Sequence, residues 1–295
     1  MHAAPEIFTG HSRPVPKGRV SRVARALWRQ GARTLNAPPG LRFDGQVTLV
    51  TGGTRGIGAA LAAELSARGA EVVVSARSAP ETGKLAFLRM DLGSADSVRE
   101  AVRALPALTG GRPLDALVLN AGIVPERGQT VGGREAAYAV NVLGHHRLFR
   151  ALHAGGQLAD GATVVVVTGD VLIFASSPEP MEGVAPLRAY ARSKLGNLWQ
   201  AREMARRFPN LRVVAVHPGG VATTLDGSSD GWRGKLKRIT LISPELAARS
   251  VVVALDPDAL PGGSYFHNVY GSVPLSEDGG AERAAFWRKL EEDAA

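Results

Sequence analysis

The sequence contains no cysteine among its 295 residues. Disulfides, thiolate metal sites and cysteine nucleophiles are therefore excluded, which fits a reducing compartment. Long apolar runs are also absent: the longest purely apolar stretches, such as Val164 to Val167, cover a few residues, whereas a membrane-spanning helix needs about 20. The N-terminus lacks the charged-then-apolar order of a secretory signal. We expect a cytoplasmic protein.

Basic residues are concentrated at the N-terminal end of the chain. The formal net charge is +8, and residues 1–44 hold eight Lys or Arg against Glu6 and Asp44, so this segment supplies +6 of it. A basic tail on a nearly neutral remainder differs from the broad basic surface of a nucleic-acid-binding protein. We therefore expect no nucleic-acid partner.

Residues 1–44 form a basic N-terminal extension with one amphipathic segment. Apolar residues recur at helical spacing from Val20 to Leu35, arginines fill the opposite side, and Pro38-Pro39-Gly40 ends the pattern. We predict a helix that packs on the body of the protein or on a second subunit. Contact with a membrane surface is the alternative for a basic amphipathic helix.

From residue 45 the chain alternates short β-branched runs with longer Ala/Leu/Arg helical patterns. Strands of this kind separated by helices predict an α/β fold with a doubly wound parallel sheet, the Rossmann fold, and no linker divides residues 45–295. The expected strands are Gln46–Thr51, Glu71–Ser75, Leu85–Arg89, Asp115–Leu119, Ala162–Thr168, Arg212–His217 and Gly263–Phe266. The expected helices are Ile57–Arg68, Ser94–Leu105, Arg134–Leu152, Arg188–Phe208 and Pro244–Ala254.

A glycine-rich turn follows the first expected strand and leads into an Ala-rich helix. Glycine permits positive φ and lets a phosphate approach the backbone, and the first N–H groups of the helix attract an anion. Because the turn lies between a strand and a helix, as the dinucleotide fingerprint requires, we predict a dinucleotide site. The residues expected to line it are Thr51, Gly52, Thr54, Arg55, Gly56, Ile57 and Gly58.

The end of the second expected strand indicates which dinucleotide is preferred. NAD sites place an acidic residue there for the ribose 2′-hydroxyl, whereas the 2′-phosphate of NADP favours cations. The chain has no Asp or Glu at this point and reads Ser75-Ala76-Arg77. Arg77, with Arg55 from the turn, can form charge-assisted hydrogen bonds to the phosphate. We predict NADP(H) as the cofactor; two solvated arginines are the alternative interpretation.

Tyr190 and Lys194 are the main candidates for proton transfer. Their i, i+4 spacing puts both side chains on one face of a helix. Tyrosine has a reference pKa near 10, and a nearby ammonium with an oxidised nicotinamide is expected to lower it. The phenol can then donate a proton to a carbonyl oxygen, or accept one in the reverse direction.

Taken in order, these motifs resemble those of the short-chain dehydrogenases/reductases, and most of all the retinol-dehydrogenase-like branch, over about residues 45–270. The motifs are Thr51-Gly52-x-x-x-Gly56-x-Gly58, Asp91-Leu92, Asn120-Ala121-Gly122, Asn141, Tyr190-x-x-x-Lys194 and Pro218-Gly219. The resemblance implies that Lys194 also holds the nicotinamide ribose and that Asn141 supports a water-linked proton path. It also implies cofactor contacts, for which a turn or cap role is the alternative, at Asp91, Leu92, Asn120, Ala121, Gly122, Pro218, Gly219, Val221 and Thr223.

The fifth expected strand departs from the family pattern. The family usually ends this strand with two small hydroxyl residues, the second of which orients the substrate carbonyl, and here that position falls on Gly169. Thr168, Asp170 or the Ser176-Ser177 pair are the possible substitutes, and Thr168 is favoured. A substrate that holds its own carbonyl, or a reaction other than simple carbonyl reduction, is the alternative.

Two long apolar segments, Val171–Leu187 and Ala222–Ile242, are expected beyond the strand ends. Loops of this length are usually functional, and we predict a substrate lid near 222–243 over a hydrophobic small-molecule site. His145 and His146 are adjacent on one helix and are expected at the surface or at an interface. No metal-ligand spacing is found, and no metal is expected.

The sequence therefore predicts an NADP(H)-dependent oxidoreductase that transfers hydride between nicotinamide and a carbonyl or secondary alcohol. A non-redox step on the same fold, such as cyclisation, dehydration or isomerisation, is one alternative, and a non-catalytic nucleotide-sensing protein is another. A homo-oligomer is compatible with the sequence. The substrate, the direction of reaction and the role of the N-terminal extension stay open.

Overall fold

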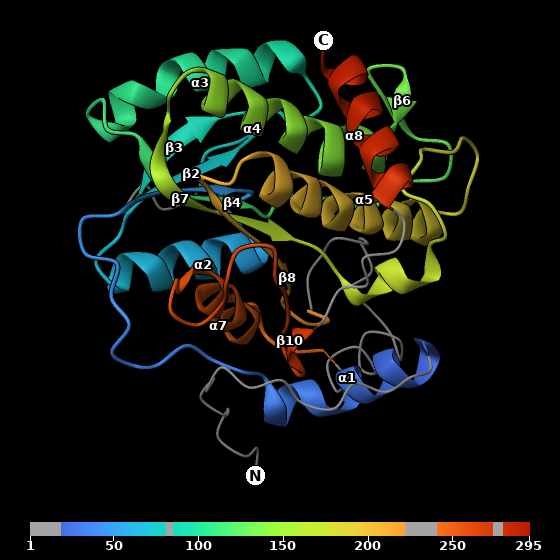
Figure 1. The fold of residues 1–295 in the computed structure, drawn as a ribbon, viewed down its shortest axis with the longest axis horizontal. Coiled ribbons are helices and arrows are strands. Elements are labelled where there is room, and N and C mark those ends of the chain that lie inside the picture. Colours follow the sequence, from blue (N-terminus) through green and yellow to red (C-terminus); the bar gives the residue numbers. More distant parts are fainter. Residues whose placement is uncertain (1–18, 81–84, 222–240, 274–279) are drawn as a thin grey trace.

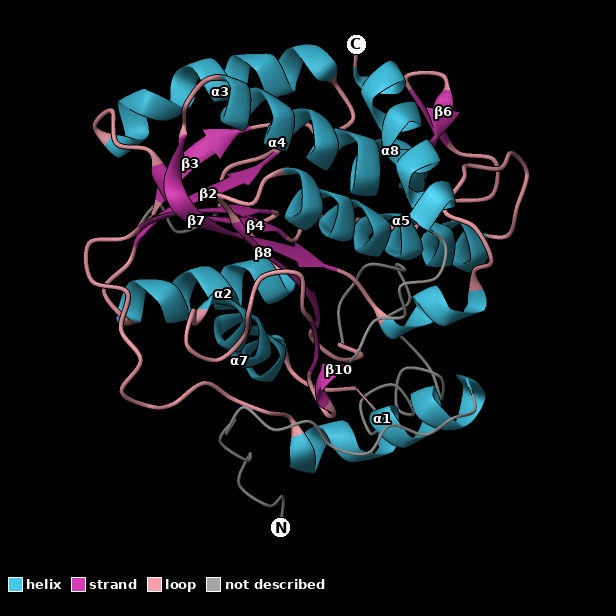
Figure 2. Ribbon diagram, in the orientation of Figure 1, coloured by secondary structure: helices cyan, strands magenta, loops and turns pink. Residues whose placement is uncertain are grey.

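An eight-stranded sheet forms the centre of the computed structural model, which describes residues 19–80, 85–221, 241–273 and 280–295 (Figures 1 and 2). Its order is β10-β9-β8-β7-β4-β1-β2-β3, and every pairing is parallel except that of β9 with β10. The strands are β1 (Val47–Thr51), β2 (Glu71–Ala76), β3 (Ala86–Arg89), β4 (Leu114–Leu119), β7 (Leu158–Val167), β8 (Arg212–His217), β9 (Tyr265–His267) and β10 (Gly271–Val273).

Helices cover both faces of this sheet, which confirms the predicted doubly wound α/β fold. Figure 2 shows α3, α4 and α5 above the sheet and α2 and α7 below it, with α8 beside α4 and α5. The bounds are α2 (Gly56–Ala67), α3 (Ala95–Thr109), α4 (His145–Ala154), α5 (Pro186–Arg207), α7 (Pro244–Leu255) and α8 (Gly280–Ala294).

The central strands are buried because alternate side chains serve two separate apolar cores. In β7, Val164 and Val166 join the core beneath α3, α4 and α5, whereas Val165 and Val167 join the core beneath α2 and α7. Such a strand has no solvent-facing side and therefore reads as a continuous run of valines. The carboxyl ends of these strands meet at one edge of the sheet, where ligands of open α/β folds bind.

The predicted N-terminal helix is present as α1 (Arg19–Arg33). Its residues Ala26 and Gln30 are buried, and the helix contacts the 3-10 turn η2 (Asp170–Phe174) that follows β7 (Figure 1). Of the predicted alternatives, packing on the body of the protein is confirmed for its inner face. No helix in the described ranges combines the length and apolar character needed to span a membrane.

Four features differ from the sequence prediction. The helix expected over Arg134–Leu152 is a short hairpin, β5 (Thr130–Val131) with β6 (Arg134–Glu135), then a π-helical turn η1 (Tyr138–Gly144), and only then α4. Gly132 and Gly133 both have positive φ, which makes the tight hairpin turn possible. The strand β7 begins earlier than expected, and the helix α8 and the three-residue strand β10 were not predicted.

Candidate active site

The turn of residues 51–58, here called the nucleotide turn, is fixed by the backbone. The N–H groups of Gly52 and Gly53 both donate to the carbonyl oxygen of Ser75 in β2, at 2.7 and 3.3 Å. Gly58 lies so close to the start of the turn that a β-carbon there would be 2.2 Å from the carbonyl oxygen of Gly52. Glycine is therefore required at this position for strand and helix to approach one another.

The first turn of α2 lacks the side-chain cap that α3 and α7 have. In α3 and α7 a serine hydroxyl, of Ser94 and Ser243, accepts a hydrogen bond from a first-turn N–H. In α2 the preceding Arg55 makes no such bond, and the first turn contains no acidic residue. Its N–H groups and positive helix end therefore face the turn ready for an anion.

Two arginines stand beside this helix end. Arg55 lies in the nucleotide turn and Arg77 directly follows β2, two residues after the Ser75 carbonyl to which the turn is bonded. Both side chains are exposed, and within the described residues neither guanidinium is paired with a carboxylate. No carboxylate of the described residues thus neutralises the positive charge at this point.

Thr51 connects the nucleotide turn to the Asn120-Ala121-Gly122 motif. Its buried hydroxyl oxygen accepts the N–H groups of Asn120 and Ala121, at 2.9 and 3.1 Å, and it lies 3.0 Å from Nε2 of His145. His145 Nδ1 lies 3.1 Å from the carbonyl oxygen of Asn141, which can only accept, so Nδ1 carries the proton. The single proton of the threonine hydroxyl is then shared between His145 Nε2 and the carbonyl oxygen of Val118, 3.2 Å away. A chain of hydrogen bonds therefore runs from the end of β1 to Asn141.

The expected surface position of His145 and His146 is wrong. Both residues are fully buried at the start of α4, directly after the π-helical turn η1. Burial lowers the pKa of each histidine to about 3, so both are neutral at physiological pH. His146 packs edge-on against Trp287 of α8, an element that the sequence analysis did not include.

The side chain of Asn141 holds two segments together. Its Oδ1 accepts the N–H of Ile123 at 2.8 Å, and its Nδ2 donates to the Ile123 carbonyl at 2.9 Å and to Oγ of Ser193 at 3.0 Å. A β-carbon on Gly122 would lie 3.5 Å from Asn141 Oδ1 and 3.6 Å from Lys194 Nζ. Asn141 and Lys194 therefore meet at the motif that follows β4.

Tyr190 and Lys194 lie on one face of α5, as the spacing predicts. Lys194 Nζ is 5.4 Å from the centre of the Tyr190 ring and donates a hydrogen bond of 3.1 Å to the carbonyl oxygen of Val167, the last residue of β7. Asn197, one turn further along, donates to the same oxygen. The lysine is therefore fixed against the strand end, with its charged end beside the phenol.

Burial is the main influence on the pKa values of this pair. It raises the pKa of Tyr190 to about 12; the lowering that we expect from Lys194 together with an oxidised nicotinamide stays a prediction for the cofactor complex. Burial also lowers the pKa of Lys194 to about 8. In this arrangement the phenol is protonated at neutral pH, which is the state that a proton donor needs.

The structure does not support Thr168 as the group that orients a substrate. Thr168 is 3% exposed, and its hydroxyl donates its single proton to the backbone carbonyl of Lys194 at 2.9 Å. Gly169 next to it has extended backbone, and a β-carbon there would meet nothing closer than 3.8 Å, from Lys194 and Val171. The space that a serine would fill is therefore present beside Lys194, without a side chain in it.

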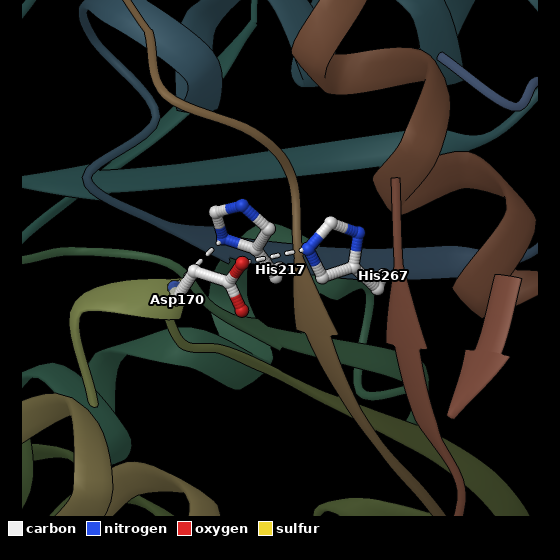
Figure 3. A group of neighbouring side chains, drawn as sticks. All are labelled: Asp170, His217 and His267. Carbon is white, nitrogen blue, oxygen red and sulfur yellow. Dashed lines mark hydrogen bonds and ion pairs between the residues drawn. The ribbon is translucent and has the colours of Figure 1, made fainter. Parts of the chain in front are cut away.

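Asp170 belongs to a buried group that the sequence analysis did not find. It lies between His217, at the end of β8, and His267, at the end of β9 (Figure 3). One possible ligand atom from each of these residues lies within 4.8 Å of the others, so the trio, here called the strand-end cluster, has the composition of a metal site. No sequence spacing could reveal it, because its members come from three separate elements.

The hydrogen bonds of the strand-end cluster favour a proton-bearing network over a metal. His267 Nδ1 accepts backbone N–H bonds of 3.1 and 3.4 Å, so its proton is on Nε2, which lies 2.9 Å from Asp170 Oδ2. His217 Nδ1 accepts the N–H of Asp170 at 3.1 Å, which again places the proton on Nε2. A histidine that binds metal through Nε2 needs its proton on Nδ1, where these backbone donors already point.

The other predicted residues are distributed around the same edge of the sheet. Asp91 Oδ1 accepts the N–H of Gly93, a turn of the kind weighed as its alternative role, and Leu92 is buried. Pro218 and Gly219 follow β8, and Val221 is bridged to Ile242. Thr223, and the predicted lid except for 241–243, lie outside the described residues.

Comparison with known proteins shows a family and several individual proteins that are similar to this chain. A family model described as short chain dehydrogenase matches residues 46–234. A polyprenol dehydrogenase of Mus musculus is 33% identical over 265 residues, covering 78% of each chain. A protein of Bos taurus named dehydrogenase/reductase SDR family member 13 is 34% identical over 268 residues, covering 80% of this chain and 70% of its own.

A solved protein structure is also similar to this chain. A blue fluorescent protein from a metagenomic library, crystallised in complex with NADPH, aligns with a TM-score of 0.64 and 26% identity, over 78% of this chain and 99% of its own. The structural likeness thus extends over most of the chain and nearly all of that protein.

Proposed function

Because the chain belongs to the short-chain dehydrogenase/reductase family of oxidoreductases, we propose that it transfers hydride between NADP(H) and a carbonyl or secondary alcohol of a hydrophobic substrate. The observation that carries this proposal is the meeting of two sites at one edge of the sheet. The nucleotide turn reaches Asn141 through Thr51 and His145, and Asn141 reaches the Tyr190 helix through Ser193. The chain thus holds an anion site and a proton donor in one connected framework.

The residues of the nucleotide turn fit a dinucleotide with a 2′-phosphate. The uncapped end of α2 suits the pyrophosphate, and the close approach at Gly58 leaves the backbone accessible to it. Arg55 and Arg77 offer unneutralised guanidinium groups beside the end of β2, where a carboxylate would favour NAD. We assign these residues, with the predicted residues of the following motifs, to cofactor binding.

The bound cofactor supplies the hydride or accepts it. Tyr190 donates the accompanying proton to the carbonyl oxygen in the direction of reduction, because burial keeps its phenol protonated. Lys194, fixed by the Val167 carbonyl, stabilises the phenolate that remains. Asn141 keeps the two segments on either side of the proton donor in place.

The segment beyond β7 supports a hydrophobic substrate. Three large apolar side chains of this segment and the start of α5 are exposed: Phe174 by 52%, Met181 by 44% and Leu187 by 65%. They lie on the chain between Gly169 and Tyr190, so they border the region where a substrate must meet the phenol. Apolar surface of this kind is characteristic of ligand-binding clefts.

The first test is a titration of the purified protein with NADPH and NADH, followed by absorbance measurements with a panel of hydrophobic ketones and aldehydes. We expect tighter binding of NADPH and loss of the reduced-nicotinamide absorbance. Failure to bind either dinucleotide would remove the proposal. Substrate turnover without any change in that absorbance would instead support the non-redox alternative.

The cofactor preference has its own test, the variant Arg77→Asp. It replaces the proposed partner of the 2′-phosphate with a carboxylate that repels the phosphate and accepts from a ribose hydroxyl. The ratio of NADPH to NADH affinity should fall about tenfold or more, since a charge-assisted bond is lost and a repulsion gained. An unchanged ratio would show that Arg77 does not bind the 2′-phosphate.

A further inference from the structure

The N-terminal helix contributes one buried polar side chain to the turn that follows β8. Gln30, on the inner face of α1, is 1% exposed. Its Nε2 donates to the carbonyl oxygen of Gly220 at 3.0 Å, and its Oε1 accepts the N–H of the same glycine at 2.8 Å. The carboxamide thus pairs with both polar groups of one residue, as a neighbouring strand would.

Two glycines make this contact possible. A β-carbon on Gly219, whose φ is +114°, would lie 2.9 Å from Gln30 Oε1 and 2.7 Å from Nδ2 of Asn268. A β-carbon on Gly220 would lie 2.7 Å from Leu27 of α1. The absence of both side chains lets the helix rest directly on the backbone of the turn.

The chain on either side of this contact is also anchored. Beyond α1, the N–H of Leu35 donates to the carbonyl of Asn268 at 2.7 Å, and the N–H of Asn268 donates to the carbonyl of His217 at 3.0 Å. On the far side of the turn, the N–H of Ile242 donates to the same Gly220 carbonyl at 3.0 Å. Helix α1 is therefore joined to the ends of β8 and β9 by hydrogen bonds, and its inner face is not a spare docking surface.

We propose that Gln30 is a positioning residue for the nicotinamide end of the cofactor, a role that rests on the function proposed above. Gly220 directly precedes Val221, a cofactor contact that the family resemblance places at the nicotinamide carboxamide. Its backbone is fixed from one side by Ile242 and from the other by Gln30. The N-terminal extension is in this way part of the oxidoreductase site, and it acts on the half of the cofactor that carries the hydride.

The test uses the full chain with Gln30→Met, which keeps the length of the side chain and removes both hydrogen bonds. The matched control is Arg29→Met, the same change on an exposed neighbour in α1. Two ligands are titrated: NADPH, and adenosine 2′,5′-bisphosphate, which carries the adenine end of the cofactor and no nicotinamide. We expect the Kd for NADPH to rise about tenfold in Gln30→Met, as for a lost buried hydrogen bond, with an unchanged Kd for the bisphosphate. Arg29→Met should bind both ligands as the wild type does.

Each of the other outcomes contradicts either this inference or the proposed function. An unchanged Kd for NADPH in Gln30→Met overturns the inference, and so does an equal loss for both ligands, which indicates a general structural role. If the wild-type protein binds neither ligand, the proposed function itself fails. Should Gln30→Met not fold, Gln30→Asn keeps a polar amide but withdraws it from Gly220, and it must show the same selective loss.

Discussion

The nucleotide turn and the strand-end cluster lie at the same edge of the sheet, but they hold their shapes by different means. The nucleotide turn is built from neighbouring residues, backbone hydrogen bonds and glycines, and its positive helix end carries no cap. The strand-end cluster is built from side chains of η2, β8 and β9, and α1 closes over the adjacent turn. The first region carries the glycines of the motif that resembles the family, whereas the second adjoins Gly169, where the sequence departs from the family pattern.

This difference indicates where the chain is specialised. Backbone geometry recognises a pyrophosphate whatever the rest of the cofactor carries, so the nucleotide turn has little freedom to vary. In the proposed function, the side chains that follow β7, β8 and β9 meet the substrate and the nicotinamide end of the cofactor. Gly169, the buried pair of Asp170 and His267, and helix α1 lie in this region. We expect changes in the two regions to affect different measurements.

The largest effect should come from Tyr190→Phe, which removes the proton donor and little else. Turnover with a carbonyl substrate should fall about a hundredfold to ten-thousandfold, the usual contribution of a general acid. The affinity for NADPH should not change, because the nucleotide turn is intact. Steady-state kinetics beside a fluorescence titration tests both statements; normal turnover would contradict the assigned role of the phenol.

A change in the nucleotide turn should give the opposite pattern. In Gly58→Ala the added methyl group would overlap the Gly52 carbonyl, so the turn must open. We expect NADPH affinity to fall about tenfold to a hundredfold, the cost of an overpacked site. Gly40→Ala is the control, since a β-carbon there meets nothing within 4 Å. Equal affinities for the two variants would show that the close approach is not needed for binding.

The role of Gly169, which lies next to the strand-end cluster, can be tested by adding a side chain. Gly169→Ser restores the hydroxyl that the family places there, and the structure leaves room for its β-carbon beside Lys194. We expect turnover of a simple ketone to rise about tenfold, less than the full value of a native hydrogen-bond donor at such a site. A fall in turnover would mean that the substrate itself occupies this space.

The last prediction concerns stability rather than activity. The pKa values of His145 and His146 are lowered by burial to about 3, from about 6.5 in the unfolded chain. Between these pH values the unfolded chain takes up protons that the folded chain excludes, so stability is full above pH 6.5 and falls as the pH drops. Each histidine should remove about 1.4 kcal/mol per pH unit. Urea unfolding from pH 7 to pH 5 measures this slope, and His146→Phe should lower it.

The same comparison explains which parts of the molecule could be predicted from the sequence. The doubly wound sheet and the nucleotide turn were predicted because local patterns of valine, alanine and glycine define them. Tyr190 and Lys194 were placed together because they are four residues apart on one helix. These features need only the geometry of neighbouring residues.

The remaining features depend on contacts between distant residues. Gln30 and Gly220 are separated by 190 positions, and the members of the strand-end cluster come from three elements. The hydroxyl of Thr168 was assigned to the substrate because a sequence does not show that a backbone carbonyl already accepts its proton. His145 and His146 were expected at the surface or at an interface because the residues that they contact, Thr51 and Trp287, are far away in the sequence.

The hydrogen-bonded chain from Thr51 through His145 to Asn141 has a practical consequence. One imidazole touches the threonine of the nucleotide turn with one nitrogen and the backbone of Asn141 with the other. Because His145 stays neutral and in a single tautomer, its two ring nitrogens give distinct NMR signals. Nitrogen-15 labelling of histidine thus provides a native probe that reports, atom by atom, on movement at either end of the chain.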